Sequence, residues 1–347
     1  MKSKTNSHSV HRPTSIEVAK AAGVSRATVA FVFNERMRSM ISPATQRKVL
    51  RAARKLGYHL DPVGRALSKG QSDEISFVES DPSELDPFVT MGWIRALQLR
   101  ANDLNYSVGV HFLPEASRRR RERLTGIFAR HQVGVILVGG SVTRAEVALA
   151  RKMGVRVLVL FENQVGREIS IRFPVEEMWQ TAANHLLERG HRSVAYLHRE
   201  HLGPVSQSSL QRVVSSLHSV VDPAGGTLTE LKMDPTPAGA RTVVDALLAA
   251  PSHPTAICGF KDEYCFLIGR ELAKRGLRVP EDLAIICGSG DSRLCELSEP
   301  PLTSVTADLE AIAHNLVHII DAVSRGKEPN PEWLVPPVPR LIVRASS

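Results

Sequence analysis

Beyond residue 72, short apolar segments of the sequence alternate with longer amphipathic ones. The short segments have the composition of buried strands, and the long ones have the 3.6-residue periodicity of helices. We expect strands at 75–78, 107–112, 133–138, 155–161, 194–198, 227–231, 256–260 and 284–287. We expect helices at 90–104, 118–130, 143–152, 175–189, 206–220, 237–249 and 262–275. This alternation predicts an α/β fold with two parallel sheets of right-handed βαβ units, one in each of two lobes spanning 73–347.

The first 72 residues carry a different pattern, which predicts helices without strands. Thr14 and the glutamate three positions later form a capping box, so a helix is expected at about 14–22. Gly23 can adopt the left-handed conformation that ends this helix, and Ser25 can cap a second helix at about 26–34. Two short helices joined by such a turn are typical of a helix-turn-helix, whose second helix lies in the major groove of DNA.

A third helix is expected between Ser42, followed by proline at the first helical position, and Gly57. The apolar residues expected to form the core of this unit are Val49, Leu50, Ala53 and Leu56 of the third helix and Val18, Ala22, Val29 and Phe33 of the first two. The sequence therefore predicts a small all-α domain at 14–60, preceded by a disordered basic arm at 1–13 and followed by a hinge and linker at 61–72.

Positive charge is concentrated in this N-terminal part of the chain. In residues 1–72, Lys and Arg number 14 and Asp and Glu number three, a net charge of +11, which leaves −3 of the total of +8 for residues 73–347. A basic head of this kind indicates a polyanionic partner, either nucleic acid or an acidic membrane surface. Combined with the helix-turn-helix pattern, it favours DNA.

Other motifs in the sequence carry no chemistry of their own. The spacing of Cys258, Cys265, Cys287 and Cys295 fits no zinc or redox motif, so we interpret them as small core residues. His198 and His201 lack the spacing of a zinc site, and the Gly288-Ser-Gly290 fragment lacks the third glycine of a dinucleotide loop. The arginines from Arg118 to Arg121 are interpreted as a solvated helix face, with contact to DNA or a partner as the alternative. We expect no metal, no cofactor and no enzymatic activity.

No apolar segment reaches the roughly 20 residues needed to cross a bilayer, and the N-terminus has no apolar core of a signal peptide. A cytoplasmic protein is expected.

Residues 18–72 read VAKAAGVSRATVAFVFNERMRSMISPATQRKVLRAARKLGYHLDPVGRALSKGQS. This segment resembles the N-terminus of the LacI/GalR family of bacterial repressors, which reads approximately DVAxxAGVSxxTVSRVLN and then VSxxTRxRVxxAxxxLGYxPNxxARxL. The matching residues are Val18-Ala19, Ala22-Gly-Val-Ser25, Thr28-Val29, Asn34, Ser42, Leu56-Gly-Tyr58, Arg65 and Leu67. Looser family signatures follow at His185–Arg192, Pro254–Ile257, Gly276–Asp282 and Pro300–Thr303. The resemblance implies a periplasmic-binding-protein-like effector domain whose lobes close on a small molecule.

The resemblance also implies roles for residues of the helix-turn-helix. Arg26, Ala27 and Phe31 would read bases, and the residues that would contact phosphates are Thr14, Ser25, Thr28 and Asn34. Two alternatives stay open, a nonspecific phosphate contact for Arg26 and plain packing for Phe31. The family usually has Ser-Arg where this chain has Ala30-Phe31, so its operator is expected to differ.

In the hinge, the resemblance implies a short helix that forms on DNA and pairs with that of a second subunit. Leu67 would enter the minor groove, supported by Arg65 and Ala66, and would bend the duplex. Gly64 stands where the family usually has alanine, which lowers helix propensity and predicts a more ligand-sensitive hinge.

The family's effector site is matched only in part. Ser209 stands where an arginine usually holds the ligand, and the pocket candidates are Phe88, Ser209, Lys261, Asp262 and Asp291. As surface charges and an ordinary packing aromatic, these residues have an equally simple structural interpretation.

The sequence as a whole predicts a transcription regulator, a repressor by preference, that binds a pseudopalindromic operator as a homodimer. A small-molecule effector, with a sugar or sugar derivative as one candidate, would modulate its affinity. The alternative is a cytoplasmic solute-binding module without specific DNA readout.

Overall fold

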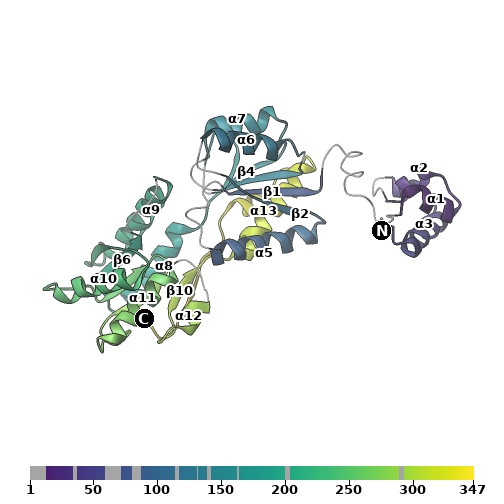
Figure 1. Cartoon of the computed structure of the whole chain (residues 1–347). Helices are drawn as coiled ribbons and strands as arrows, with labels where there is room; N and C mark the ends of the chain where they lie inside the picture. The colour runs from purple at the N-terminus through teal and green to yellow at the C-terminus, as the bar shows by residue number, and fades with distance from the viewer. Residues whose placement is uncertain are drawn as a thin grey trace, which may run out of the picture. The chain divides into compact units, whose positions relative to one another are not determined.

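The computed structural model describes residues 13–33, 37–58, 72–79, 87–113, 117–130, 132–138, 142–161, 164–199, 204–288 and 293–347 (Figure 1). At 87–90, 117–118 and 204–209 the description covers the backbone alone. Residues 1–72 and residues 73–347 form two compact units.

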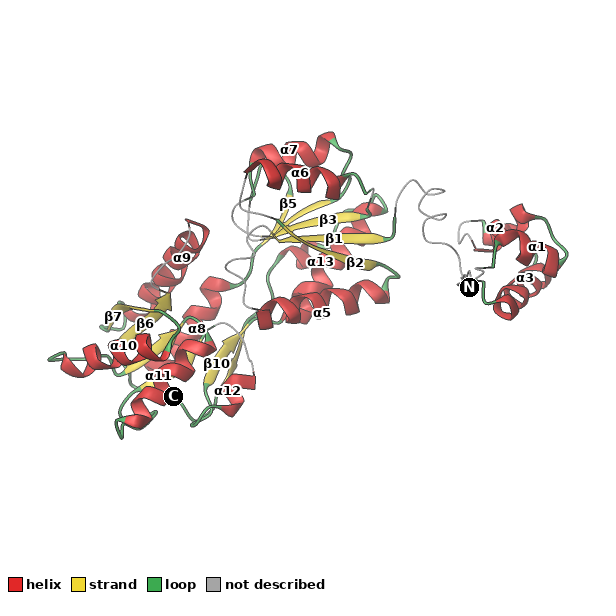
Figure 2. Cartoon of the chain, in the orientation of Figure 1, coloured by secondary structure: helices red, strands yellow, loops and turns green. Residues whose placement is uncertain are grey.

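The first unit is all-helical over its described residues (Figure 2). Its elements are α1 (Ser15–Ala22), α2 (Arg26–Phe33), η1 (Arg38–Met40) and α3 (Pro43–Leu56). Thr14 Oγ1 accepts a hydrogen bond from the Glu17 amide, and the Glu17 carboxylate accepts one from the Thr14 amide at 2.7 Å, so the predicted capping box is confirmed. Gly23 ends α1 with a φ of 64°, a conformation that costs glycine little and other residues more.

The core of the first unit contains Val18, Ala19, Val29, Val32, Val49 and Ala53. The prediction that Leu56 belongs to this core is wrong, because its side chain remains 38% exposed at the last position of α3. Tyr58 packs against this cluster instead, with its ring 5.6 Å from that of Phe33 in an edge-to-face arrangement. Leu56 is the last residue of α3, and the chain leaves the helix at Gly57, which has a φ of 66°.

The first sheet of the second unit, sheet A, is entirely parallel over the described strands. Its order is β2-β1-β3-β4-β5, with the strands β1 (Glu74–Glu79), β2 (Ser107–Phe112), β3 (Gly134–Val138), β4 (Leu158–Phe161) and β5 (Ile169–Ile171). Phe77 of β1 lies between Val110 of β2 and Ile136 of β3. Strand β2 is thus an edge of the sheet.

Helices cover both faces of sheet A (Figure 1). One face packs on α5 (Pro87–Asp103) and α13 (Leu309–Ser324), and the other on α6 (Ser117–Phe128) and α7 (Arg144–Lys152). Successive side chains of β3 point to opposite faces of the sheet. Ile136 packs in the cluster with α5 and α13, whereas Val135 and Leu137 pack in the cluster with α6 and α7.

The second sheet, sheet B, has the order β11-β10-β9-β8-β6-β7. Its strands are β6 (Ser193–Arg199), β7 (Thr227–Met233), β8 (Ala256–Gly259), β9 (Ala284–Cys287), β10 (Thr303–Thr306) and β11 (Arg340–Ile342), and only the β10–β11 pair is antiparallel among them. The helices of this part of the chain are α8 (Val175–Glu188), α9 (Pro204–Val221), α10 (Pro237–Ala249), α11 (Asp262–Lys274) and α12 (Arg293–Leu297), with the short η3 (Pro331–Leu334) before β11.

The predicted α/β class with two parallel-rich sheets is confirmed, but three strands were not predicted: β5, β10 and β11. The sequence of β10, TSVT, is largely polar and still buried. Its polar groups are satisfied from the end of the chain, because Ser346 Oγ accepts from the Thr303 amide at 2.8 Å and Thr303 Oγ1 accepts from the Arg344 amide at 2.9 Å. The strand expected at 155–161 begins only at Leu158.

All four cysteines are buried and none forms a disulfide bond with another described residue, which confirms their interpretation as small core residues. Burial raises the pKa of Cys258 to about 12, so this thiol stays protonated at neutral pH.

None of the described helices is both long and apolar enough to cross a membrane.

Candidate nucleic-acid interface and ligand site

Helix α2 has one buried and one exposed side. Val29 and Val32 are buried in the three-helix core, whereas Arg26, Ala27 and Ala30 are exposed. This division follows from the helical periodicity, because the valines lie three positions apart on one face. The start of α2 therefore presents Arg26 and Ala27 to solvent, which is what a recognition helix requires.

Arg26 is also tied to the first helix. Its Nε donates a hydrogen bond to Oγ of Ser15, the first residue of α1, over 3.3 Å. The two Nη groups of Arg26 make no hydrogen bond to any residue within the described parts of the chain. Sequence reasoning did not identify Ser15, because the contact spans 11 positions and depends on how the two helices cross.

The hydroxyl groups predicted to contact phosphates have local partners. Ser25 Oγ accepts from the Thr28 amide at 3.1 Å and lies 2.9 Å from Thr28 Oγ1, which begins α2 as expected. Thr14 Oγ1 donates to the Glu17 carboxylate at 2.9 Å. These bonds fix the starts of α1 and α2, where backbone N–H groups point outward and favour anions. Asn34 lies outside the described residues.

Phe31 is half-buried, and it is not part of the core cluster of the first unit. Val32 and Phe33 of the same helix contribute to that cluster instead. The role of Phe31 in base reading stays a prediction.

A second basic surface lies on α3, and the sequence indicated it only through the net charge of the first 72 residues. The exposed cations of this helix are Arg47, Lys48, Arg51, Arg54 and Lys55. Among the residues that the structure describes, none of these five has an ion-pair partner. The sequence could have predicted this surface, because the basic residues of α3 stand between its apolar positions and so lie on its exposed face.

The hinge residues Arg65, Ala66 and Leu67 lie outside the described residues, and so does Gly64. Of the five candidates for the effector site, Asp291 is likewise outside, and the side chains of Phe88 and Ser209 are not described.

The two remaining candidates, Lys261 and Asp262, are neighbours at the start of α11, just beyond β8. Both are half-buried. The Lys261 ammonium group lies 5.6 Å from the centre of the Phe260 ring, and Asp262 Oδ1 accepts from the Glu263 amide at 2.8 Å. Ligands of open α/β sheets bind at the carboxyl ends of the strands, and this pair lies at such an end.

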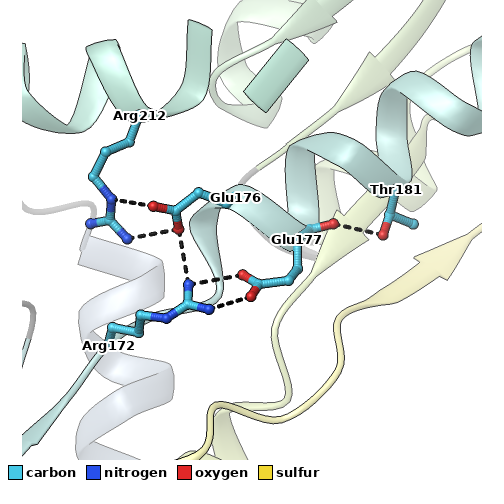
Figure 3. A network of polar contacts seen from close by, with 5 residues as sticks. All are labelled: Arg172, Glu176, Glu177, Thr181 and Arg212. Carbon is cyan, nitrogen blue, oxygen red and sulfur yellow. Dashed lines mark hydrogen bonds and ion pairs between the residues drawn. The ribbon is translucent and has the colours of Figure 1, made fainter. Parts of the chain in front are cut away.

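Arg212 is one turn beyond Ser209 on α9, and its guanidinium group is bonded to another helix (Figure 3). Nε and Nη2 of Arg212 donate to the two oxygens of Glu176 at 2.6 and 2.8 Å. Arg172 donates to Glu176 at 3.0 Å and also binds Glu177. The hydrogen bond from Arg212 lowers the pKa of Glu176. Arg212 thus links α9 to α8.

The described residues contain no group of three or more His, Cys, Asp or Glu side chains that could hold a metal ion. His198 is buried, with Nε2 3.4 Å from the Glu230 carboxylate.

The chain has a basic helix-turn-helix unit followed by a two-lobed α/β unit, which is the architecture of a class of transcription regulators. Two family models match the chain: the model for bacterial regulatory proteins of the lacI family matches residues 16–61, and the model for the periplasmic binding protein-like domain matches residues 183–347. The chain belongs to the LacI family of bacterial regulatory proteins.

Curated relatives align along most of the chain. Catabolite control protein A of Priestia megaterium is 26% identical over 88% of this chain and 91% of its own length. The HTH-type transcriptional regulator GntR of Pseudomonas aeruginosa is 28% identical over 94% of each chain. The HTH-type transcriptional repressor CytR of Escherichia coli is 27% identical over 83% of each. GntR and CytR are named as regulators of transcription.

Solved structures share the fold. A lac repressor dimer bound to operator and the anti-inducer ONPF superposes with a TM-score of 0.73 at 22% identity, covering 97% of this chain and 99% of that one. The complex of the transcriptional regulator CelR with cellobiose superposes with a TM-score of 0.62 at 25% identity, covering 97% of this chain and all of that one (100%).

Proposed function

We propose that this transcription regulator binds a pseudopalindromic DNA operator as a homodimer, represses transcription there, and changes its operator affinity when a small molecule binds its α/β unit. The observation that carries the proposal is the exposed start of α2, where Arg26 and Ala27 project from a closed three-helix core in the basic part of the chain.

Sequence would be read mainly by Arg26. Its two Nη groups can donate to O6 and N7 of one guanine, the commonest specific contact of arginine in the major groove. Ala27 and Phe31 would meet apolar groups such as a thymine methyl. Phosphate contacts from Thr14, Ser25, Thr28 and Asn34 would fix the register without reading sequence. The basic surface of α3 adds long-range attraction to the duplex.

The dimeric state is proposed from the symmetry that DNA imposes. A helix-turn-helix half-site is short, so two copies related by a two-fold axis read an inverted repeat with useful affinity. The operator-bound lac repressor with this fold is a dimer. Arg65, Ala66 and Leu67 of each hinge at 61–72 would then meet at the centre of the operator, where Leu67 would widen and bend the minor groove. A regulator that acts on the chromosome would work in the cytoplasm.

The effector is proposed to be a sugar or a sugar derivative, bound near Lys261 and Asp262 together with Phe88, Ser209 and Asp291. Support comes from the position of the Lys261-Asp262 pair beyond a parallel strand and from the cellobiose complex of CelR. With serine at 209 and Arg212 engaged by Glu176, hydroxyl groups of a neutral ligand suit this site better than a carboxylate or phosphate. Affinity for the operator would change if the ligand binds two lobe arrangements with different strength.

The decisive experiment is selection of bound sequences from random duplexes with the full chain. We expect recovery of an inverted repeat with a guanine in each half-site. With Arg26→Ala, the preference for that guanine should be lost. Recovery of no enriched sequence would leave a solute-binding module without DNA readout as the better description. Titration of the complex with mono- and disaccharides then tests the effector separately.

A further inference from the structure

Two histidines are stacked on α13, away from the residues proposed to bind DNA or the effector. The rings of His314 and His318, one helical turn apart, have their centres 3.8 Å from each other and are inclined by 27°. Both side chains are half-buried. Histidine is the side chain that ordinarily changes its charge close to neutral pH. Two rings in contact therefore form a candidate for a response to pH.

One ring of the pair is fixed by the helix itself. Nδ1 of His318 lies 2.8 Å from the carbonyl oxygen of His314, and since a carbonyl oxygen only accepts, Nδ1 carries the proton and donates. Nε2 of the neutral His318 ring is then an acceptor. Neither ring nitrogen of His314 has a hydrogen-bond partner within the part of the chain that the structure describes. A further proton can thus be taken up by the pair, but two charged rings at this distance would repel each other.

The surroundings of the pair disfavour that proton. Burial lowers the pKa of His314, the neighbouring His318 and Arg100 of α5 lower it further, and Asp103 of α5 acts in the opposite direction. Arg100 also lies 3.4 Å from Asp103, so the helix packed on this side presents a cation and an acid that are paired with each other.

Other charged groups near the pair have partners of their own. On α13, Glu310 lies 3.2 Å from Arg100, and Asp321 accepts from the Tyr106 hydroxyl at 2.8 Å and also binds Arg325. Strand β4, on the sheet side of α13, has the apolar sequence LVLF. The charged residue of η3 is Glu332, which is exposed and caps its own turn with Asn330.

His318 also contacts the segment that follows α13. The ring of Trp333 in η3 has its centre 5.4 Å from that of His318 and is tilted by 54°. η3 leads to β11, which pairs with β10 in sheet B, whereas α13 covers sheet A. The chain therefore passes between the two lobes before and after α13. Trp333 lies on the return connection, defined here as residues 331–342.

We propose that the stacked His314–His318 pair is a pH-responsive contact between the two lobes. At neutral pH the uncharged rings hold Trp333, and with it the return connection, on α13. In mild acid the pair takes up a proton, the stack opens and the return connection loosens. This contact does not depend on the proposed DNA binding or effector, because it lies within the second unit and can be measured without either.

The direction of the response follows from the burial of His314. Its pKa in the closed contact is lowered below the ordinary 6.5, so the open or unfolded segment binds the proton more readily. The contact is therefore complete above pH 6.5 and weakens as the pH falls below it towards the pKa of the closed contact. Attraction of a charged His318 to the Trp333 ring would act in the opposite direction and tighten the connection in acid.

Amide hydrogen exchange of the full chain, read by mass spectrometry and corrected for the intrinsic dependence of exchange on pH, tests the proposal. Between about pH 7.5 and about pH 5.5, protection of residues 331–342 should fall by roughly threefold or more. Strand β6, in the core of sheet B, is the internal reference and should keep its protection. Constant protection of residues 331–342, or a rise in acid, would overturn the proposal.

Variants of the two histidines assign the response to the pair. His314→Gln/His318→Gln cannot take up the proton, and glutamine is a good helix former, so this variant should fold and lose the pH dependence. His218→Gln, at an exposed histidine of α9, is the matched control and should keep it. His314→Lys places a permanent charge at the stack and should give, at neutral pH, the protection that the wild type has in acid. A pH dependence that survives in the double variant would refute the assignment.

NMR titration of the histidine rings measures the coupling directly. Because His318 lowers the pKa of His314, His318→Gln should raise the titration midpoint of His314. The control variant His218→Gln should leave that midpoint unchanged. A midpoint that is the same in His318→Gln and the wild type would show that the two rings titrate independently, which contradicts the proposed pair.

Discussion

Nε of Arg26 donates a hydrogen bond to Oγ of Ser15 over 3.3 Å and so joins the first residue of α1 to the first residue of α2. The bond fixes the end of a long side chain that would otherwise lose conformational entropy when DNA binds. Ser15 is therefore a positioning residue for Arg26.

Ser15→Ala should weaken operator binding by about 0.5 to 1.5 kcal/mol, the usual cost of immobilising one flexible side chain when a complex forms. Fluorescence anisotropy with a selected operator measures this loss, and thermal unfolding should be unchanged because alanine suits the start of a helix. Ser39→Ala, at an exposed serine of η1, is the control. Equal affinities of Ser15→Ala and the wild type would show that Arg26 needs no such support.

Arg26→Ala should cost about 1 to 3 kcal/mol at the specific operator and relax the preference at one base position in each half-site. The measurement is affinity across a set of operators with single base changes. If Arg26 instead contacts phosphate, the loss would be the same for every sequence, including random DNA.

The local signals of the helix-turn-helix unit could be predicted from the sequence. Thr14, Glu17 and Ser42 act within three residues of themselves, so their capping bonds depend only on neighbouring positions. The alternation of strands and helices likewise predicted two parallel sheets. Helices cover both faces of a parallel sheet, so each strand is a short apolar segment that the sequence shows directly.

Contacts between distant segments could not be predicted in this way. Glu146 lies 26 positions from Arg120, and Thr303 lies 43 positions from Ser346. Such pairs arise only once the elements are packed. The effector candidates stay predictions, because a site at the ends of several strands is assembled from loops that carry no periodicity.

The interpretation of Arg118 to Arg121 as a solvated helix face is wrong at Arg120, whose Nε lies 2.5 Å from Glu146 Oε1 of α7. This ion pair predicts that Arg120 contributes more to stability than its exposed neighbour Arg121. Both side chains are mostly buried, at 13% and 14% exposure, so removal of one partner leaves the other charge poorly solvated. Arg120→Gln should lower the free energy of unfolding of the second unit by about 1.5 to 3 kcal/mol in urea titrations. Arg121→Gln, at the exposed neighbour, should have almost no effect. Similar losses in the two variants would contradict the burial of Arg120.

The contact between Arg212 and Glu176 predicts a dependence of stability on acid. The hydrogen bond from Arg212 lowers the pKa of Glu176 below its ordinary 4.5 in the folded protein. The unfolded chain therefore binds a proton first as the pH falls, so this stabilisation is present above pH 4.5 and is lost below it as the pH falls through the folded pKa.

Glu176→Gln should accordingly lower the melting temperature at neutral pH, and the difference from the wild type should shrink in more acidic buffers. Because Glu176 is partly exposed, we expect a small effect, which calorimetry at a series of pH values can resolve. Glu328→Gln, at an exposed glutamate with no ion pair to any described residue, should give a difference that does not change with pH. A constant difference for Glu176→Gln would contradict the shift.

Gly126 should be replaceable with a gain in stability. It lies within α6, its φ is not positive, and a Cβ there meets nothing within 4 Å, so alanine loses no packing and reduces the conformational entropy of the unfolded chain. Gly126→Ala should raise the free energy of unfolding by about 0.5 to 1 kcal/mol. Gly276→Ala is the opposite case in the same unit, because Gly276 has a φ of 72° and alanine there is strained by about 1 to 2 kcal/mol. Urea titrations of the two variants measure both effects, and a loss of stability in Gly126→Ala would contradict the open space around Gly126.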